Sequence, residues 1–240
     1  MRDDPTRTLT LRNRFASRLR GVFRRWISSY LQGLPGVWQL SESGIVCLNV
    51  DDALNAVERS WAEYSGEFDD VVDRHIEEGY KRGGRNSVRQ LRLAGLDAVF
   101  GLTSRDVEAM DLLERNGLKL VKNVGEDVKK EMSRVITTGY NEGWGIDKIG
   151  RVLREEAMSM SVHRSNLIAR TETIRAYNSA ASNQYKRYGV EFYEWIAAAS
   201  ERTCPECMDL DGNVFKLNEG PLPPVHPACR CSIAPVTDIE

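Results

Sequence analysis

Apolar residues recur at three- and four-residue steps near the start of the chain. The positions are Phe15, Leu19, Val22, Trp26 and Tyr30. The arginines between them fall mostly on other faces, so the spacing predicts a basic amphipathic helix. Glycines and prolines then interrupt the periodicity over residues 31–48, and we expect a linker or an irregular docking segment there.

The hydrophobic pattern over residues 51–189 is mostly helical. A long apolar stripe begins after Asp51 or Asp52 and is expected to end at Gly83 and Gly84. Breaks at Gly143 and Gly145, and an end at Gly189, are also expected because glycine commonly ends helices. The remaining helical patterns cover residues 86–100, 104–117, 123–142, a short stretch around 149–153, and 167–188.

The pattern changes from helical to strand-like after Gly189. The stretches "VEFYEWIAAAS", "NVFKL" and "CRCSIAPV" are short and rich in β-branched and aromatic residues. Turn residues separate them, at Asp211-Gly212 and at a proline cluster from 221 to 224. These signals predict a small β-containing lobe in the last fifty residues.

Composition places the chain among soluble globular proteins. Its 240 residues, 41% of them hydrophobic, are enough for one large or two small domains with a core, which argues against disorder throughout. No apolar run approaches the length of a membrane span, and the N-terminus lacks the apolar region of a secretory signal. We therefore expect no membrane contact and no export through a signal peptide.

The net charge of −2 conceals an uneven distribution. Residues 1–30 contain eight arginines and two aspartates, giving +6, so the rest of the chain carries −8. Three roles fit the N-terminal helix: a solvated charged face, docking of its apolar stripe on a protein partner, or contact with nucleic-acid phosphates. The last two can coexist, and their candidate contact residues are Arg12, Arg14, Arg18, Arg24, Arg25 and Trp26.

Four of the five cysteines and one of the three histidines lie within residues 204–231. Their spacing, C-x2-C-x18-H-x2-C-x-C, is typical of a structural zinc site in which each of two turns supplies a pair of ligands. We place Cys204, Cys207 and Cys229 first, with His226 and Cys231 competing for the fourth position. Thiols kept reduced for a metal also favour assembly in a cytosol.

A lobe of about fifty residues buries little apolar surface for its length. Structural zinc contributes an apparent ~10–16 kcal/mol in small peptides, so an ion can replace the missing core. The alternatives are disulfides or free thiols, and a catalytic metal with Glu206, Asp209 or Asp211 as a base. The predicted fold class is α+β, a predominantly helical body with a small C-terminal zinc-ribbon-like β lobe, divided at 1–50, 51–160 and 161–240.

Charged residues near the expected lobe are better explained as a structural network than as an active site. Buried charges must be paired, so we expect Glu172 and Arg170 to hold the lobe against the helix through backbone groups or Arg202, with Arg230 as a further partner for Glu172. The expected network comprises Arg170, Glu172, Arg202 and Arg230. No Ser/His/Asp order, phosphate-binding loop or H-E-x-x-H motif is present in the sequence. We therefore predict that the protein is not an enzyme.

The C-terminal half carries a set of motifs in a fixed order. These are "IARTETIRAYNSAASNQYKRYGV", "YEW", "RTCPECMDLDGNVF", and "PPVHPACRC" followed by "IAP". Together with "VITTGYNEGWGIDKIGRVLRE" they resemble the phage Mu F-like minor head protein family, also known as the phage head morphogenesis family. The resemblance covers about residues 120–236, and residues 161–240 are expected to form the Mu F-like module.

The resemblance implies a minor capsid protein of a tailed virus, assembled in the host cytoplasm and located in the capsid interior near the portal vertex. The implied partners are the portal protein, the major capsid or scaffolding protein, and packaged DNA through non-specific contacts. The implied task is to assist head assembly and DNA packaging or ejection. The competing hypotheses are a metal-dependent nuclease or hydrolase acting on nucleic acid, and a DNA-binding accessory protein outside the virion.

Overall fold

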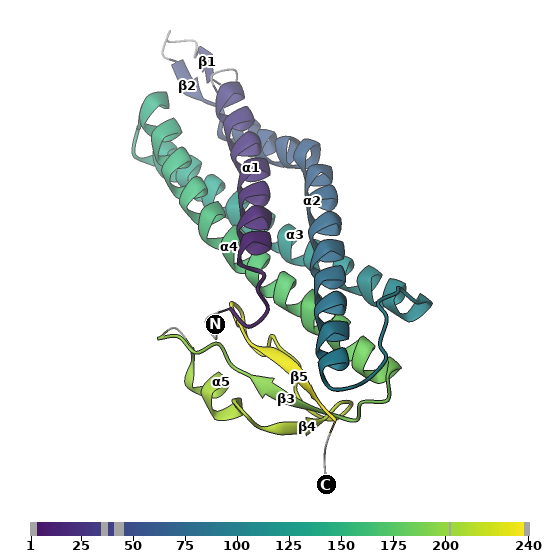
Figure 1. Ribbon diagram of the computed structural model, residues 1–240. Helices are drawn as coiled ribbons and strands as arrows, with labels where there is room; N and C mark the ends of the chain where they lie inside the picture. The colour runs from purple at the N-terminus through teal and green to yellow at the C-terminus, as the bar shows by residue number, and fades with distance from the viewer. Residues whose placement is uncertain (1–3, 35–37, 41–45, 202, 238–240) are drawn as a thin grey trace. The chain divides into compact units, whose positions relative to one another are not determined.

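The computed structural model describes residues 4–34, 38–40, 46–201 and 203–237. It combines long helices with a small C-terminal sheet (Figure 1), which confirms the predicted α+β class. The helices are α1 (Leu9–Gly33), α2 (Val50–Leu93), α3 (Ser104–Asn141), α4 (Ile146–Arg187) and the short α5 (Pro205–Leu210). The strands are β1 (Trp38–Leu40), β2 (Val46–Leu48), β3 (Phe192–Ile196), β4 (Val214–Lys216) and β5 (Ser232–Val236).

The chain divides into two compact units, each built from non-contiguous segments. Unit 1 comprises Met1–Phe15, Val72–Gly117 and Asn166–Glu240, and unit 2 comprises Ala16–Val71 and Leu118–Ser165. Each of the four long helices contributes residues to both units. The predicted boundary between residues 160 and 161 falls inside α4.

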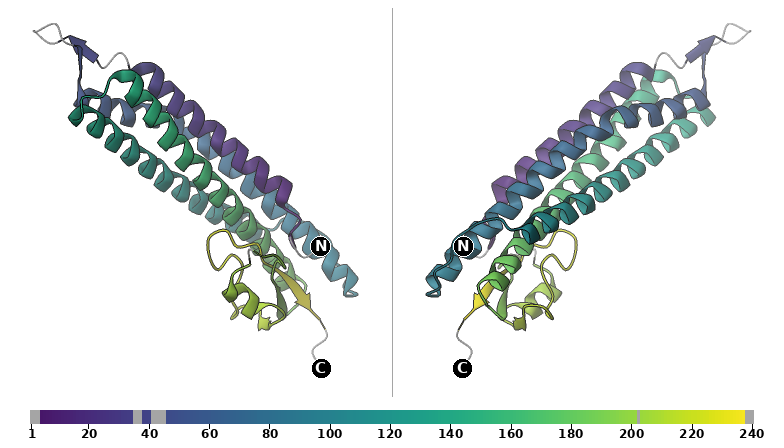
Figure 2. Two further views of the ribbon diagram at one scale, coloured as in Figure 1. Left: turned by 90° about the vertical axis from the view of Figure 1, so that its left-hand side faces the viewer. Right: turned by 90° about the vertical axis from the view of Figure 1, so that its right-hand side faces the viewer.

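In unit 2, the apolar stripe of α1 packs against α2 and does not form a separate arm. The Phe23 and Phe68 rings lie 4.6 Å apart, and those of Trp26 and Trp61 lie 4.7 Å apart in an edge-to-face contact. The indole N–H of Trp26 also donates a hydrogen bond of 3.0 Å to Ser60 Oγ. The α1 part of this unit lies beside α2 (Figures 1 and 2), so its amphipathic face belongs to the protein core.

Several predicted helix breaks are absent, because the glycines allow close packing and do not end the helix. The helix α2 continues through Gly83, where a Cβ atom would lie only 2.7 Å from the Cα of Tyr177 on α4. Likewise α3 continues through Gly117, where a Cβ would lie 2.8 Å from Val72 Cγ1. The helices expected around 149–153 and over 167–188 are one continuous helix, α4.

The segment over 31–48 is more regular than expected. Within it, β1 and β2 form an antiparallel pair in which Gln39 is opposite Cys47. The helix ends expected near Gly143 and Gly189 are confirmed. Both glycines adopt positive φ, at 67° and 73°, two residues after the last residues of α3 and α4. Among the described residues, no helix is long and apolar enough to cross a membrane.

The C-terminal lobe in unit 1 is an antiparallel sheet with the strand order β4-β3-β5. Phe192 of β3 is opposite Lys216 on one side and Val236 on the other. The tight turn before β4 contains Gly212 at φ 78°, as the Asp-Gly dipeptide predicts. The sheet lies beside the C-terminal part of α4 (Figure 2), and α5 connects β3 to β4.

Candidate metal centre

The first pair of cysteines lies at the start of α5. Cys204 is the N-cap residue, and Pro205 occupies the first helical position, where its missing N–H costs no hydrogen bond. The Cys204 Sγ accepts a hydrogen bond of 3.4 Å from the Cys207 N–H. The C-P-E-C sequence therefore forms a tight turn that presents both sulfur atoms on one side.

The second group of candidate ligands precedes β5. The N–H of Cys229 donates to the carbonyl oxygen of His226 at 3.3 Å, which closes a turn between these two residues. Ala228 within this turn has φ 64°, in the left-handed region that non-glycine residues seldom adopt. This turn places His226 beside Cys204 and Cys207, and Cys229 beside Cys207.

The turns bring the five predicted ligands together. His226 Nε2 lies 3.2 Å from Cys204 Sγ and 3.1 Å from Cys207 Sγ, and the sulfur atoms of Cys207 and Cys229 are 3.8 Å apart. In Cys204, Cys207 and His226, and again in Cys207, Cys229 and Cys231, the ligand atoms lie within 4.8 Å of one another. Two thiolates bound tetrahedrally to zinc at ~2.3 Å are separated by ~3.8 Å, so the donor set suits this metal.

The orientation of His226 also suits metal binding. Its Nδ1 lies 2.8 Å from the carbonyl oxygen of Pro227, which can only accept a hydrogen bond. The proton therefore resides on Nδ1, and the lone pair of Nε2 points at the sulfur atoms of Cys204 and Cys207. Metal-binding histidines are commonly oriented in this way by a second hydrogen bond.

The thiols differ in their readiness to ionise. A hydrogen bond from Cys231 is the main reason why the pKa of Cys229 falls to about 5. Burial, followed by the nearby Cys229, raises the pKa of Cys207 to about 12. The pKa of Cys231 is raised, chiefly by its hydrogen bond to Cys229. A bound cation would stabilise the thiolate form of each cysteine ligand, so metal binding would release protons.

A small cavity lies between the Cys and His side chains, with a volume of about 10 Å³. This is about the space that one water-sized atom needs, and it is far below the ~300–1,000 Å³ of ligand pockets. In this structure Cys204, Cys207, Cys229 and Cys231 are free thiols, with no disulfide between them. The cluster can hold a metal ion.

Three side chains of α4, spaced seven residues apart, hold the loop and strand that carry the second group of ligands. Thr171 Oγ1 accepts from the Ala228 N–H at 3.1 Å. Asn178 Nδ2 donates to the Cys231 carbonyl at 3.2 Å, and Tyr185 OH to the Ile233 carbonyl at 3.3 Å. In the sequence these side chains stand out only as members of a helical stripe, and their seven-residue spacing was the available signal.

Of the expected charge network, the structure shows one ion pair of Glu172, with an arginine outside the predicted set. Glu172 is 0% exposed and forms its ion pair with Arg175, one turn later on α4. Burial raises the pKa of Glu172, and Arg175 partly opposes this shift. Arg230 is half-buried and lines the small cavity, whereas Arg170 is a half-buried residue of α4. Arg202 lies outside the described residues.

The predicted contact residues of α1 differ in their availability. Trp26 is 0% exposed, so its ring is not presented to a partner. Arg12 is 5% exposed and pairs with Asp4 at 2.9 Å. Arg14 pairs with Glu78, and Arg25 pairs with Glu67. Of the six, Arg18 and Arg24 are exposed and have no ion pair among the residues that the structure describes.

The part of the chain that contains the Cys/His cluster is similar to known proteins. Residues 130–234 match the family described as Phage Mu protein F like protein, which confirms the predicted resemblance over these residues. An uncharacterized protein of Methanocaldococcus jannaschii is 27% identical over 135 residues, or 55% of this chain and 21% of that protein. The chain thus spans about a fifth of that relative's length. No solved structure matches.

Proposed function

We propose that the protein is a minor structural component of a tailed-virus head that associates with the portal inside the capsid. The match over residues 130–234 carries this proposal, because the matched family suggests head morphogenesis. The match includes all five predicted ligands and the α4 residues that hold them. The portal contact, and assistance in DNA packaging or ejection, extend that family context to this chain.

The proposed role of the Cys/His cluster is to hold a structural zinc ion. Cys207, Cys229 and Cys231 form one small core cluster with Trp195 and Ala197. An ion at this point would link α5 to the start of β5. The expected contribution is ~10–16 kcal/mol, as for other small zinc-dependent folds.

The alternative, a metal-dependent nuclease, has less support from the site. A catalytic zinc needs an open coordination position, a substrate pocket and a base. The cavity at the cluster measures about 10 Å³, far below the ~300–1,000 Å³ of ligand pockets. Of the three carboxylates considered as bases, Asp211 accepts a hydrogen bond from the Ala197 N–H at 2.8 Å, and Glu206 and Asp209 are exposed. These contacts fit turn formation.

Quantitative mass spectrometry of purified DNA-filled particles, combined with chemical cross-linking, tests the head-protein proposal. The expected result is a low and reproducible copy number, with cross-links to the portal protein. Absence of the chain from filled particles and from assembly intermediates would refute it.

Zinc removal separates the structural role from the enzymatic one. A structural ion predicts that a chelator unfolds the C-terminal lobe, which near-ultraviolet circular dichroism and hydrogen exchange would detect. An enzyme would instead lose zinc-dependent nuclease activity while this lobe stays folded. Nuclease activity that zinc restores to the folded, chelated protein would favour the enzyme hypothesis.

A further inference from the structure

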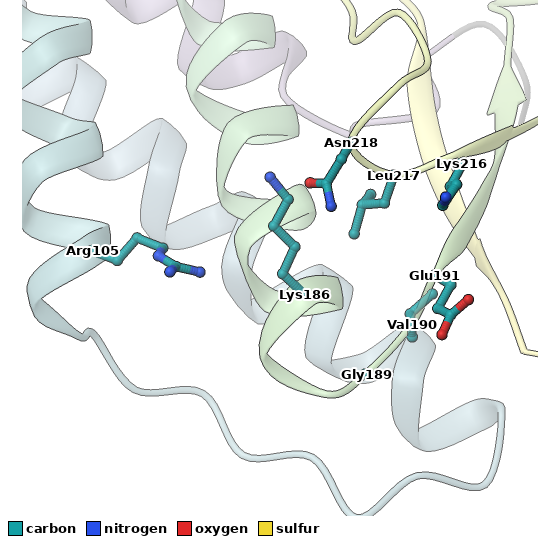
Figure 3. Close-up of a pocket in the computed structure, with 8 residues that line it drawn as sticks. All are labelled: Arg105, Lys186, Gly189, Val190, Glu191, Lys216, Leu217 and Asn218. Atoms are coloured by element: carbon teal, nitrogen blue, oxygen red, sulfur yellow. The ribbon is translucent and has the colours of Figure 1, made fainter.

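A second, much larger cavity lies within unit 1, with a volume of about 820 Å³. It is bordered by the start of α3, the last turn of α4 and the end of β4 (Figure 3). The side chains that matter for its chemistry are Arg105, Lys186, Glu191, Lys216 and Asn218. This basic cavity lies within the size range of sites that bind ligands or peptide side chains.

Positive charge exceeds negative charge in the basic cavity. Lys216 pairs with Glu219 at 2.9 Å, and Glu191 acts on the same ammonium group at longer range. Arg105 and Lys186 have no ion pair within the described part of the chain. Both are exposed, and Figure 3 shows them extending from two different helices. Two cations therefore remain available to an anionic partner.

Hydrogen bonds join the loop before α3 to the end of α4, next to residues that line the basic cavity. Tyr188, which follows α4, accepts from the Val99 N–H at 2.7 Å and donates to the Val99 carbonyl at 2.8 Å. Arg187 Nη1 donates to the Gly101 carbonyl at 3.0 Å. On the other side, Lys216 is fixed by the pairing of β4 with β3. A preformed site loses less conformational entropy on binding.

Exposed apolar side chains lie on the loop that leads to Arg105 and on the first turn of α3. Val99 is 57% exposed, Leu102 42% and Val107 47%. The hydrogen bonds from Tyr188 and Arg187 hold this loop next to the last turn of α4, whose Lys186 lines the cavity. We call these three side chains the apolar rim; they do not line the cavity itself but flank Arg105 in the sequence, on the loop before it and in the turn after it. Arginine combined with exposed apolar groups is typical of protein interfaces.

We propose that the basic cavity and its apolar rim bind an acidic amphipathic segment of a protein partner. Carboxylates of the segment would pair with Arg105 and Lys186, and its apolar residues would cover Leu102 and Val107. Charge complementarity selects an anionic occupant, and the exposed apolar side chains favour a protein segment. A nucleic acid would use the two cations but would leave the apolar rim exposed. The binding site does not depend on the head-protein role.

Fluorescence anisotropy with a defined probe tests this proposal on the full chain. The probe is a helix-forming peptide of ~18 residues with glutamates on one face and leucines on the other. We expect saturable binding that the double variant Arg105→Glu/Lys186→Glu weakens by at least ~10-fold, since close charge reversal costs several kcal/mol. The matched control, Lys119→Glu, reverses an exposed lysine elsewhere on α3 and should bind the peptide unchanged.

The apolar and charged contributions to peptide binding can be measured separately. Leu102→Ser should weaken peptide binding without changing its salt dependence, because it removes only apolar contact. A peptide with glutamine in place of glutamate should bind at least ~10-fold more weakly than the probe. Thermal unfolding of each variant shows whether a loss of binding reflects misfolding; if the double variant misfolds, Lys186→Gln replaces it.

Several results would overturn the proposal. One is no peptide binding up to ~1 mM. Another is equal binding by the wild type and the Arg105/Lys186 variants. A third is binding of a double-stranded oligonucleotide that competes with the peptide and is lost in the same variants, since this would identify a nucleic-acid site. If the chain is absent from virus particles but the peptide results hold, the proposed function fails and this inference stands.

Discussion

The hydrogen bond between Thr171 and the Ala228 N–H is expected to stabilise the second group of metal ligands. Thr171→Val keeps the shape of the side chain and removes the hydroxyl that accepts this bond at 3.1 Å. An unsatisfied buried donor costs ~1–3 kcal/mol, and the half-buried position of Ala228 places this case near ~1–2 kcal/mol. The left-handed backbone at Ala228 then loses the contact that holds it.

The assay is chemical unfolding of the zinc-loaded protein, with chelator competition as a second readout. If the whole loss falls on the zinc-bound state, ~1–2 kcal/mol corresponds to a ~5- to 30-fold weaker apparent zinc affinity. Thr171→Ser is the matched control because it keeps the hydroxyl, and it should retain most of the affinity. If the valine and serine variants bind zinc equally, the hydrogen bond does not position the loop and the reasoning fails.

Three other changes test separate features of the structure. Cys229→Ser should abolish stoichiometric zinc binding. Cys231→Ser should retain the ion with weaker affinity, because Cys231 acts through its hydrogen bond to Cys229. Metal content measured by mass spectrometry distinguishes the two outcomes. Gly83→Ala should destabilise the protein by ~1–3 kcal/mol or more, because the new methyl group would collide with the Tyr177 backbone. Its control is Gly66→Ala on the same helix, where nothing lies within contact distance; this variant should be neutral or stabilising. Urea unfolding measures both. Burial raises the pKa of Glu172 in the folded state, so the folded protein binds more protons and wild-type stability should fall as pH rises from the unfolded pKa through the folded one. Because glutamine does not titrate, Glu172→Gln should gain stability relative to wild type over this range; unfolding measured from pH 4 to pH 7 should show a growing difference, and a constant difference would contradict the shift.

Helical periodicity predicted which residues form helices but not where the helices end. Gly83 and Gly189 are both glycines at the edge of an apolar pattern, yet α2 continues through the first and α4 ends before the second. The difference lies in the tertiary structure, because the first glycine faces the backbone of Tyr177. A single sequence contains no information on that contact.

The Cys/His cluster was predictable from the sequence to a greater extent than the side chains that hold it in place. Cysteine and histidine spacing is visible in the sequence because ligand chemistry restricts both residue type and separation. The contacts of Thr171, Asn178 and Tyr185 are to backbone groups, which every residue possesses, so their partners leave no trace in residue type. Glu172 shows the same limit, since its arginine partner is one turn away and not in the lobe.

The basic N-terminal helix was predicted as an element, but the contacts that it makes within the protein were not. Its apolar stripe packs within the protein, and acidic residues of α2 pair with Arg14 and Arg25. Each paired carboxylate stays beside its guanidinium and cancels much of the attraction for a phosphate. Only Arg18 and Arg24, of the six predicted contacts, keep their charge unopposed among the described residues.

Nucleic-acid binding by this helix should therefore depend weakly on salt. Each phosphate contact contributes about −0.9 to the slope of log K against log salt concentration, so two free arginines predict a slope of about −2. The five predicted arginines together would give about −4.5. Anisotropy with a double-stranded oligonucleotide from ~0.05 to ~0.2 M KCl measures this slope. Arg18→Gln/Arg24→Gln should remove the binding, and a slope of about −4 or steeper would show that DNA displaces the carboxylates from Arg14 and Arg25.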